Sequence, residues 1–453
     1  MELNEKLNAS VIGAGYVGLV TGVCLAELGH NILCMDTDSK KIEALNRGEL
    51  PIYEPGLKEL LLKNREENRI SFSCSVKDAL KHGTVIFIAV GTPSKDNGEA
   101  DLSYVENVAR DIAVNMDSYR LVVEKSTVPV QTGEKVRQTL QLYTKGNVDF
   151  DVASNPEFLR EGSAIRDFMD PDRIVIGIDS PRARDLLFCL YSSLAAPIIV
   201  TDIKSAELIK HASNSFLALK ISFINALSRI CEKVGADVEK VAEGMGLDKR
   251  IGPEFLKAGI GYGGSCFPKD VDAFIHISEV LGYDFNLLKE VRKINEEQKL
   301  LAVKKIKDTL WVLKGKKIAV WGASFKPDTD DVRNAPAISI ISDLLDEGAS
   351  VTIFDPKALL KIKELFKGRV EYAQDKYQVL EGADCLMLAT EWDDFKDVDF
   401  RKVKNLMRLP FVLDGRNFYK TMDLEALGFV YVPFGSSYLG KLASENKPDR
   451  AKG

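Results

Sequence analysis

The sequence has no long hydrophobic run, no paired cysteines and no basic cluster. No apolar stretch approaches the roughly 18 residues that a membrane-spanning helix needs. The seven cysteines are scattered and odd in number, without a Cys-x-x-Cys pair, which argues against a disulfide framework and a structural zinc site. The formal net charge of −6 gives no indication of a nucleic-acid surface.

Two further absences concern location and metals. The first residues, MELNEKLNAS, lack the apolar segment of a signal peptide, so we expect a cytoplasmic protein with reduced cysteines. The four histidines and the carboxylates show no metal-ligand spacing, so we expect no metal site.

The sequence does contain strand and helix patterns that alternate near both ends. Its 453 residues are enough for two or three domains. Apolar runs such as TVIFIAV and DRIVIGI are separated by helical patterns, which predicts an α/β fold with a doubly wound parallel sheet over 1–201. A period of 3.6 residues without proline begins at Asp202 and opens a helical region over 202–313. The alternation resumes in KKIAVWG, which predicts a second Rossmann-like domain over 314–453 with a disordered tail, SENKPDRAKG.

A glycine-rich turn follows the first apolar strand. In GAGYVG, Gly13, Gly15 and Gly18 have Gly-x-Gly-x-x-Gly spacing between a strand and a helix. The first glycine permits a tight turn, the second lets a pyrophosphate approach the backbone, and the third lets helix and strand pack closely. Because a helix N-terminus offers N–H donors to phosphates, the motif predicts dinucleotide binding. The alternative is a turn that serves packing alone.

An acidic residue indicates which dinucleotide would bind. Asp36 ends the second strand, where a carboxylate bonds the ribose hydroxyls and repels a 2′-phosphate. The sequence therefore favours NAD over NADP, although the neighbouring Lys40 and Lys41 weaken this preference.

Hydroxyl side chains follow two later strands. Thr92 lies in VGTPS, and Ser126 and Thr127 lie in KSTVP, each directly after an apolar run. The carboxyl ends of the strands in an open parallel sheet line its ligand crevice, so these residues are candidate ligand contacts. Alternatively, they are ordinary turn residues.

Five motifs occur in an order that resembles a known family. They are GAGYVG, NPEFLREG, LIKHASNSFLALKISFIN, GYGGSCFPKD and SFKPDTDDVR. Together they are similar to those of the UDP-glucose/GDP-mannose dehydrogenases, over nearly the whole chain. The resemblance implies two Rossmann-like domains joined by a long central helix, in a homodimer or a larger homo-oligomer. It also implies oxidation of a sugar's primary alcohol to a carboxylate, with two NAD reduced and the aldehyde retained.

A cysteine explains how one enzyme completes both oxidations. The aldehyde carbon keeps one hydrogen, so a nucleophile must add to it before it can donate hydride again. Cys266 in GYGGSCFPKD would add to give a thiohemiacetal, then a thioester that water hydrolyses. Pro268 suits the first turn of a helix, so Cys266 is expected at that helix's positive end, where a thiolate is stabilised. The alternative is a cysteine buried beneath a loop.

Two pairs with helical i, i+4 spacing accompany this cysteine. Asp270 follows Cys266 on the same face and could activate water or take a proton, while Lys269 either holds Asp270 or points to solvent. Lys210 and Asn214 lie on the long helix, and the resemblance assigns both to the active site. There a cation would stabilise an oxyanion and an amide would orient water.

Other motifs receive their roles from the resemblance alone. Glu157 would lie near the catalytic water with Thr127, and Glu161 near cofactor and substrate, although such a pair is also typical of an exposed helix face. Arg250 would reach a neighbouring subunit's site, and Arg333 would point towards the cofactor.

The predicted site residues fall into three sets. The catalytic set is Cys266, Lys210, Asn214, Asp270, Glu157 and Thr127. The cofactor-binding set is Gly13, Gly15, Tyr16, Val17, Gly18, Asp36, Lys41, Thr92, Ser126, Thr127, Glu161, Lys269 and Arg333. The substrate-binding set is Glu157, Phe158, Leu159, Arg160, Glu161, Lys210, Asn214, Arg250, Phe255, Leu256, Lys257, Gly263, Phe325, Lys326 and Arg416.

Two positions depart from the family pattern, and three alternatives stay open. Gln131 stands where the family usually has glycine, and Asn334 where an acid is common, so we expect small effects on binding. A two-electron NAD-dependent hydroxyacid dehydrogenase would use Lys210 and Asn214 without Cys266 and would yield one NADH. A nucleotide-sugar sensor would have lost turnover. A GDP-mannose dehydrogenase would share the cysteine motif, but GIGYGGSCFPKD with FLKAG favours UDP-glucose.

Overall fold

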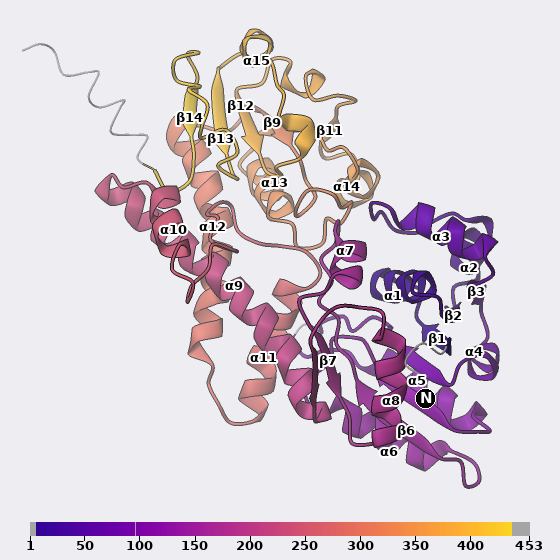
Figure 1. Ribbon diagram of the computed structural model, residues 1–453. Helices are drawn as coiled ribbons and strands as arrows, with labels where there is room; N and C mark the ends of the chain where they lie inside the picture. Colours follow the sequence, from indigo (N-terminus) through magenta and orange to yellow (C-terminus); the bar gives the residue numbers. More distant parts are fainter. Residues whose placement is uncertain (1–5, 96, 437–453) are drawn as a thin grey trace, which may run out of the picture. The chain divides into compact units, whose positions relative to one another are not determined.

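A computed structural model describes residues 6–95 and 97–436 of the chain (Figure 1). The chain divides into two compact units. Unit 1 comprises Met1–Ser213 and Asp272–Asp284, and unit 2 comprises Asn214–Val271 and Phe285–Gly453. The three-domain division expected from the sequence stays a prediction, and the tail SENKPDRAKG lies outside the described residues.

Unit 1 contains a sheet whose described strands run in the order β3-β2-β1-β4-β5-β6-β7-β8. Neighbouring strands are parallel, as expected for a doubly wound fold, except that β6 pairs antiparallel with β7 at Ser154 and Gly177. The connection between these two strands carries the six-residue helix α7 and no long crossover helix of the kind that joins parallel neighbours. The strands are β1 (Asn8–Ile12), β2 (Asn31–Met35), β3 (Ile70–Ser73), β4 (Val85–Ile88), β5 (Arg120–Glu124), β6 (Phe150–Ser154), β7 (Ile174–Gly177) and β8 (Ile198–Thr201).

Both faces of this sheet are covered by helices, so its central strands are apolar on both sides. Val11, Phe87 and Val123 pack into one core, while Ile12 and Ile88 pack into the core on the opposite face. This two-sided burial explains why the strands appear as continuous apolar runs in the sequence. The helices are α1 (Tyr16–Glu27), α2 (Ser39–Arg47), α3 (Leu57–Glu66), α4 (Val76–His82), α5 (Ser103–Asn115), α6 (Thr132–Tyr143), α7 (Ala164–Met169) and α8 (Pro181–Tyr191).

Unit 2 contains a second sheet, whose described strands are all parallel in the order β11-β10-β9-β12-β13-β14. Its two faces are again buried in separate apolar cores. The strands are β9 (Lys317–Trp321), β10 (Ser350–Phe354), β11 (Glu371–Tyr372), β12 (Cys385–Leu388), β13 (Phe411–Asp414) and β14 (Val430–Val432). The helices are α13 (Pro336–Asp346), α14 (Leu359–Phe366), η1 (Gln378–Leu380), η2 (Asp393–Phe395) and α15 (Phe400–Leu406).

A helix of 32 residues, α9 (Ile203–Val234), confirms the expected long central helix. At 1.5 Å per residue it extends about 48 Å. Its first turn is capped by Asp202, whose carboxylate accepts the Ser205 N–H at 2.9 Å, and Gly235 follows its end with a φ of +76°. The helical region continues with α10 (Val238–Gly246), α11 (Phe267–Val280) and α12 (Asn286–Leu310). Among the described helices, none has the length and hydropathy needed to cross a membrane.

Candidate active site

The predicted glycine turn lies between β1 and α1 in unit 1, and each glycine has a separate role. Gly13 has a φ of +107°, and a Cβ there would lie 2.6 Å from the carbonyl oxygen of Ala89. A Cβ at Gly18 would overlap the Gly13 carbonyl, so both positions require glycine for packing. Gly15 has no heavy atom within 4 Å of a Cβ position, so its missing side chain leaves open space at the start of α1. That space fits a pyrophosphate at a helix N-terminus.

The acid after β2 is tied to the same turn. One oxygen of Asp36 accepts the Ala14 N–H at 2.9 Å and the Lys41 ammonium at 2.8 Å. Burial opposes ionisation of Asp36, but the bonds from Lys41 and the Asp38 N–H outweigh it and lower the pKa of the carboxyl. An ionised carboxylate at this strand end suits ribose hydroxyls, so the geometry fits NAD.

The tyrosine of the glycine turn has a partner that the sequence did not indicate. The Tyr16 hydroxyl donates to Glu54, which also accepts the N–H groups of Gly162 at 2.6 Å and Ala164 at 2.8 Å. Burial and the Glu54 carboxylate raise the pKa of Tyr16. Glu54 therefore joins the start of α1 to the end of the NPEFLREG segment. Glu54 is 38 residues from Tyr16 in the chain, so local sequence spacing gave no signal.

The hydroxyl residues after β4 and β5 bind backbone groups of each other's loops. The Thr92 hydroxyl donates to the Thr127 carbonyl at 2.9 Å, and the Ser126 hydroxyl donates to the Val90 carbonyl at 2.8 Å. The two strand ends are therefore held side by side, as expected at the ligand edge of the sheet. Direct ligand contacts by these hydroxyls stay a prediction.

Two residues of α9 hold the loop that contains Thr127. The Glu207 carboxylate accepts the N–H groups of Gln131 and Gly133, both at 2.7 Å, and a ring nitrogen of His211 lies 2.8 Å from the Val128 carbonyl. The sequence analysis gave the histidines no role, and it missed Glu207. Both lie within one turn of Lys210, which was the available signal.

Glu157 and Lys210 form a buried ion pair. The Lys210 ammonium lies 3.1 Å from a Glu157 oxygen, and the two side chains are 4% and 5% exposed. The other Glu157 oxygen accepts the Leu159 N–H at 2.6 Å. The expectation that Glu157 and Glu161 share a helix face was wrong, because residues 155–162 form a loop between β6 and α7. The proline at position 156 and this carboxylate-to-backbone bond favour a turn over a helix.

Neighbours of Glu157 have different environments. The Lys210 ammonium lies 5.3 Å from the centroid of the Phe158 ring, whose face also carries the Arg173 guanidinium at 3.7 Å. Arg160 is exposed and binds Asp167 at 2.6 Å. The structure thus brings Phe158 to the ion pair and engages Arg160 elsewhere.

In unit 2, Cys266 directly precedes α11. The Asp270 N–H donates to the Cys266 carbonyl at 2.8 Å, which makes Cys266 the N-cap residue of that helix. Its thiol is partly exposed and lies 3.6 Å from the Ser265 hydroxyl. The expected position at the positive end of a helix is confirmed, and it favours the thiolate form.

Asp270 is buried in the first turn of α11 and joins two other predicted residues. One oxygen accepts the Asn214 amide at 2.6 Å, and the other accepts the Lys269 ammonium at 2.7 Å. Lys269 therefore holds Asp270, which was one of the two alternatives. Asn214, Lys269 and Asp270 form one cluster directly after the cysteine.

The glycine loop before Cys266 is anchored by surrounding elements of unit 2. Asn295 on α12 accepts the Tyr262 N–H at 2.8 Å and donates to the Tyr262 carbonyl at 3.0 Å. The Gly264 N–H donates to the Arg333 carbonyl at 2.9 Å, and a Cβ at Gly263 would overlap the Asn334 carbonyl. These contacts turn a glycine-rich sequence into a positioned loop, and sequence reasoning missed Asn295.

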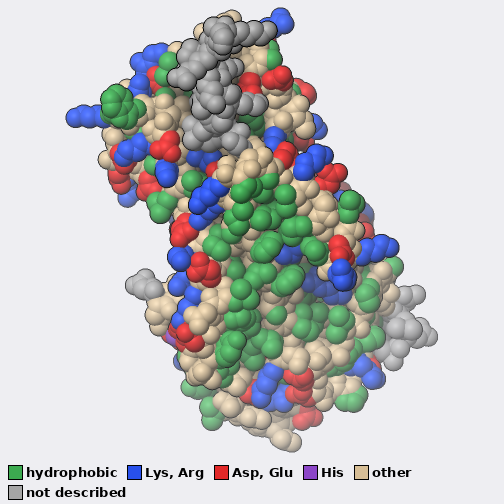
Figure 2. Space-filling model, turned by 90° about the vertical axis from the view of Figure 1, so that its left-hand side faces the viewer, with side chains coloured by type: hydrophobic (Ala, Val, Ile, Leu, Met, Phe, Trp, Pro, Cys, Tyr) green, Lys and Arg blue, Asp and Glu red, His purple; other side chains and the backbone are tan. Residues whose placement is uncertain are grey.

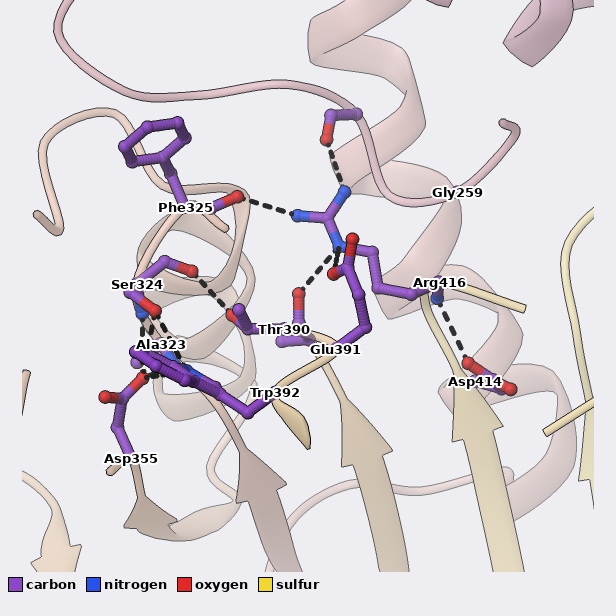
Figure 3. Close-up of polar contacts among 12 residues, drawn as sticks. Gly259, Ala323, Ser324, Phe325, Asp355, Thr390, Glu391, Trp392, Asp414 and Arg416 are labelled. Carbon is purple, nitrogen blue, oxygen red and sulfur yellow. Dashed lines mark hydrogen bonds and ion pairs between the residues drawn. The ribbon is translucent and has the colours of Figure 1, made fainter. Parts of the chain in front are cut away.

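Arg416, predicted to contact the substrate phosphates, binds backbone carbonyls in the structure (Figure 3). Its guanidinium donates to Ala389 at 2.9 Å, Gly261 at 3.0 Å and Phe325 at 3.2 Å, and lies 3.4 Å from the Glu391 carboxylate. Arg416 therefore connects the glycine loop to the ends of β9 and β12. This role was not expected from its position after β13.

The remaining predicted substrate residues vary in exposure. Leu256 is packed in a small apolar core, Lys257 is exposed, and Phe255 lies 6.1 Å from Phe267 between ring centroids. Arg250 is 88% exposed and pairs with Asp248 at 2.6 Å.

Two residues after β9 also have partners in unit 2. The Lys326 ammonium lies 5.8 Å from the centroid of the Phe325 ring. Arg333 binds Asp331 at 2.6 Å through an exposed side chain. The assignments of Lys326 to substrate and of Arg333 to the cofactor side stay predictions.

Comparison with known proteins covers the same regions. Residues 7–195, 204–297 and 319–421 match the NAD binding, central and UDP binding domains of the UDP-glucose/GDP-mannose dehydrogenase family. The chain is 47% identical to UDP-glucose 6-dehydrogenase TuaD of Bacillus subtilis (strain 168), over 94% of this chain and 92% of that protein. It is 45% identical to UDP-glucose 6-dehydrogenase of Rhizobium meliloti (strain 1021), over 95% and 99% respectively.

A solved structure shows the same likeness. The UDP-glucose dehydrogenase of Pyrobaculum islandicum superimposes with a TM-score of 0.88 at 41% identity, over 92% of this chain and 95% of that one. Together with the open glycine turn and the cysteine at the start of α11, these matches show that the chain belongs to the UDP-glucose/GDP-mannose dehydrogenase family.

Proposed function

We propose that this protein is an NAD-dependent UDP-glucose 6-dehydrogenase, which oxidises the C6 alcohol of UDP-glucose to the carboxylate of UDP-glucuronate. The observation that carries the proposal is Cys266 at the N-terminus of α11, with the buried Asp270 in the first turn of that helix. Identities of 45–47% with UDP-glucose 6-dehydrogenases over almost the full chain support the substrate.

The first oxidation converts the alcohol to an aldehyde. C6 loses hydride while its oxygen loses a proton, so negative charge develops on that oxygen. We assign its stabilisation to the ammonium of Lys210, which is buried and therefore acts in a low-dielectric environment. Asn214, held by Asp270 at 2.6 Å, orients the reacting oxygen. When bound, NAD supplies the hydride acceptor for both oxidations.

The second oxidation uses the cysteine. The Cys266 thiolate adds to the aldehyde carbon and forms a C–S bond, and the resulting thiohemiacetal expels hydride to become a thioester. Water then adds to the thioester carbon, the C–S bond breaks, and the sulfur leaves as a thiolate. Glu157, with Thr127, takes the proton from that water, and Asp270 is its counterpart beside the cysteine. Each sugar therefore consumes one water and two NAD.

Binding of the nucleotide sugar is assigned to unit 2. Lys326 and Arg416 follow strands of the second sheet, where cations suit a diphosphate. Arg416 already holds the Gly261 carbonyl at 3.0 Å, so it would couple phosphate binding to the loop that precedes Cys266.

We also assign a homodimer to the exposed face of α9. Phe216, Phe223 and Ile230 are spaced by seven residues, which places them on one side of the helix, and each is more than half exposed. Figure 2, viewed from the side on which α9 lies in Figure 1, shows hydrophobic side chains gathered in one area. Burial of such a face against a second copy is favourable. The exposed Arg250 would then be available to the neighbouring subunit.

The experiment counts NADH formed from limiting UDP-glucose with excess NAD. We expect two NADH per sugar from the wild type and no more than one from Cys266→Ala, because that variant lacks the nucleophile. Cys74→Ala, at an exposed cysteine outside the proposed site, is the matched control and should still yield two. Two NADH from Cys266→Ala would contradict the covalent mechanism. Two NADH from GDP-mannose, with none from UDP-glucose, would overturn the substrate alone.

A further inference from the structure

A buried lysine with no role in this mechanism lies near Glu157 in unit 1. Lys125 directly follows β5, and only 5% of the residue is exposed. Its ammonium donates to the side-chain oxygen of Asn155 at 3.0 Å and lies 5.9 Å from the centroid of the Tyr191 ring. An ammonium carries three donors, so its burial is costly unless a negative charge lies nearby.

The orientation of Asn155 is fixed by two other bonds. Its amide nitrogen donates to the Val175 carbonyl at 2.8 Å, and the Tyr191 hydroxyl donates to its oxygen at 2.6 Å. The Asn155 oxygen therefore faces Lys125. Since Tyr191 also binds that oxygen, it keeps a donor if the lysine is replaced.

The charged groups that face Lys125 come from two neighbouring segments. Glu157 lies in the loop after β6, and Lys210 lies on α9; Tyr191 contributes an uncharged phenol from α8. Burial lowers the pKa of Lys125 to about 8, the Glu157 carboxylate opposes this shift, and the Lys210 cation adds to it. One carboxylate thus serves two buried cations, although it forms a direct ion pair with Lys210 alone.

We propose that Lys125 is a positioning residue for the oxidation, whose positive charge keeps Glu157 ionised while Asn155 holds the ammonium in place. The inference rests on the proposed role of Glu157 as the base that takes a proton from water. Lys125 acts through Glu157 and needs no contact with the substrate. A cation near a carboxylate favours its charged form, so Lys125 widens the pH range in which Glu157 accepts a proton.

The test is the pH profile of kcat/KM, from about pH 5 to about pH 10, measured by NADH formation. Lys125→Met keeps the length of the side chain and removes its charge. We expect the acid limb of the profile to move to higher pH by about one unit, which is a tenfold loss of activity on that limb. Lys125→Arg should restore the wild-type limb.

Thermal stability gives a second readout that separates this role from a structural one. The folded pKa of Lys125, about 8, lies below that of a free lysine, so the unfolded chain binds more protons between the two values. The charge therefore opposes folding most strongly below about pH 8. Lys125→Met should keep or raise Tm at neutral pH, and the gain should fade towards pH 10. A lower Tm with an unmoved acid limb would mean that the lysine is only structural.

Two controls complete the test. Tyr191→Phe removes a hydrogen bond to Asn155 without changing charge, and Lys305→Met removes a different buried lysine, which pairs with Glu232 in unit 2. Neither should move the acid limb. Glu157→Gln should abolish that limb. A limb that disappears in Glu157→Gln but stays in place in Lys125→Met would overturn this inference alone, whereas a limb that persists in Glu157→Gln would overturn the proposed role of Glu157 as well.

Discussion

The two sheets begin with the same turn and then diverge. Gly13 and Gly322 both have positive φ, and their N–H groups bind the carbonyls of Met35 and Phe354, which end the neighbouring strands. In each sheet the next residue donates its N–H to the acid after that neighbouring strand. Up to this point the two turns are copies of one Rossmann-type design.

The next residues separate the two turns. Gly15 in the first sheet is open, and α1 begins directly after it. The corresponding position in the second sheet is Ser324, whose N–H and hydroxyl both donate to Asp355, and no helix begins until Pro336. The second turn therefore has no helix N-terminus to hold a pyrophosphate.

The acids differ in the same way. Asp36 is partly exposed and keeps capacity to accept further bonds, whereas Asp355 is buried beneath Trp392 (Figure 3). One Asp355 oxygen accepts bonds from Ala323, Ser324 and Trp392, and the other accepts the N–H groups of Lys357 and Ala358. The comparison teaches that a Rossmann-type turn becomes a cofactor site only where glycine, helix start and free carboxylate occur together.

The largest effect should follow from filling the open glycine position. Gly15→Val places a side chain where a pyrophosphate would lie, so we expect NAD affinity to fall at least about 100-fold. The fold should persist, because Gly15 has a φ of −80° and its Cβ would meet no neighbour. Titration with NAD and a thermal melt check both statements. Ser324→Gly is the matched change in the second sheet, and it should lower Tm without creating a second NAD site.

The two acids should give opposite results. Asp355→Ala leaves several buried donors without an acceptor, so we expect a stability loss of about 3–5 kcal/mol in denaturant unfolding. Asp36→Ala should cost little stability but raise the KM for NAD about tenfold. If both variants changed only stability, or both changed only the KM, the distinction between the two turns would be wrong.

The smallest effect concerns two residues with left-handed backbone beside the two turns. Gln131 has a φ of +77° and Asn334 a φ of +50°. Glutamine is disfavoured there, so Gln131→Gly should stabilise the protein by up to about 1 kcal/mol. Asparagine tolerates this region and Asn334 also donates to the Gly264 carbonyl at 3.3 Å, so Asn334→Gly should give no gain. Equal gains at both positions would argue against this reasoning.

The sequence predicted the parts of the fold and site that depend on short spacing. Alternating apolar runs identified the main strands, and three glycines identified the turn at Gly13. The proline after Cys266 indicated the start of a helix. In each case the residues that decide the local geometry lie within a few positions of one another, so the sequence pattern is a direct record of it.

The rest depends on partners far apart in the chain. Glu54 binds Tyr16, Asn155 binds Lys125, and the Arg416 guanidinium reaches Gly261. Sequence spacing carries no signal for such contacts. The wrong helix at NPEFLREG has a related cause, because Glu157 and Glu161 have helical spacing in a segment whose backbone is bonded by its own carboxylate.

The central claim is that the first sheet alone holds NAD, which leaves the second for the nucleotide sugar. Equilibrium binding of NAD to the wild-type protein, counted per chain, tests it most directly. The account predicts one NAD per chain, with UDP-glucose binding in addition and not in competition. Two NAD per chain, or displacement of NAD by UDP, would contradict it.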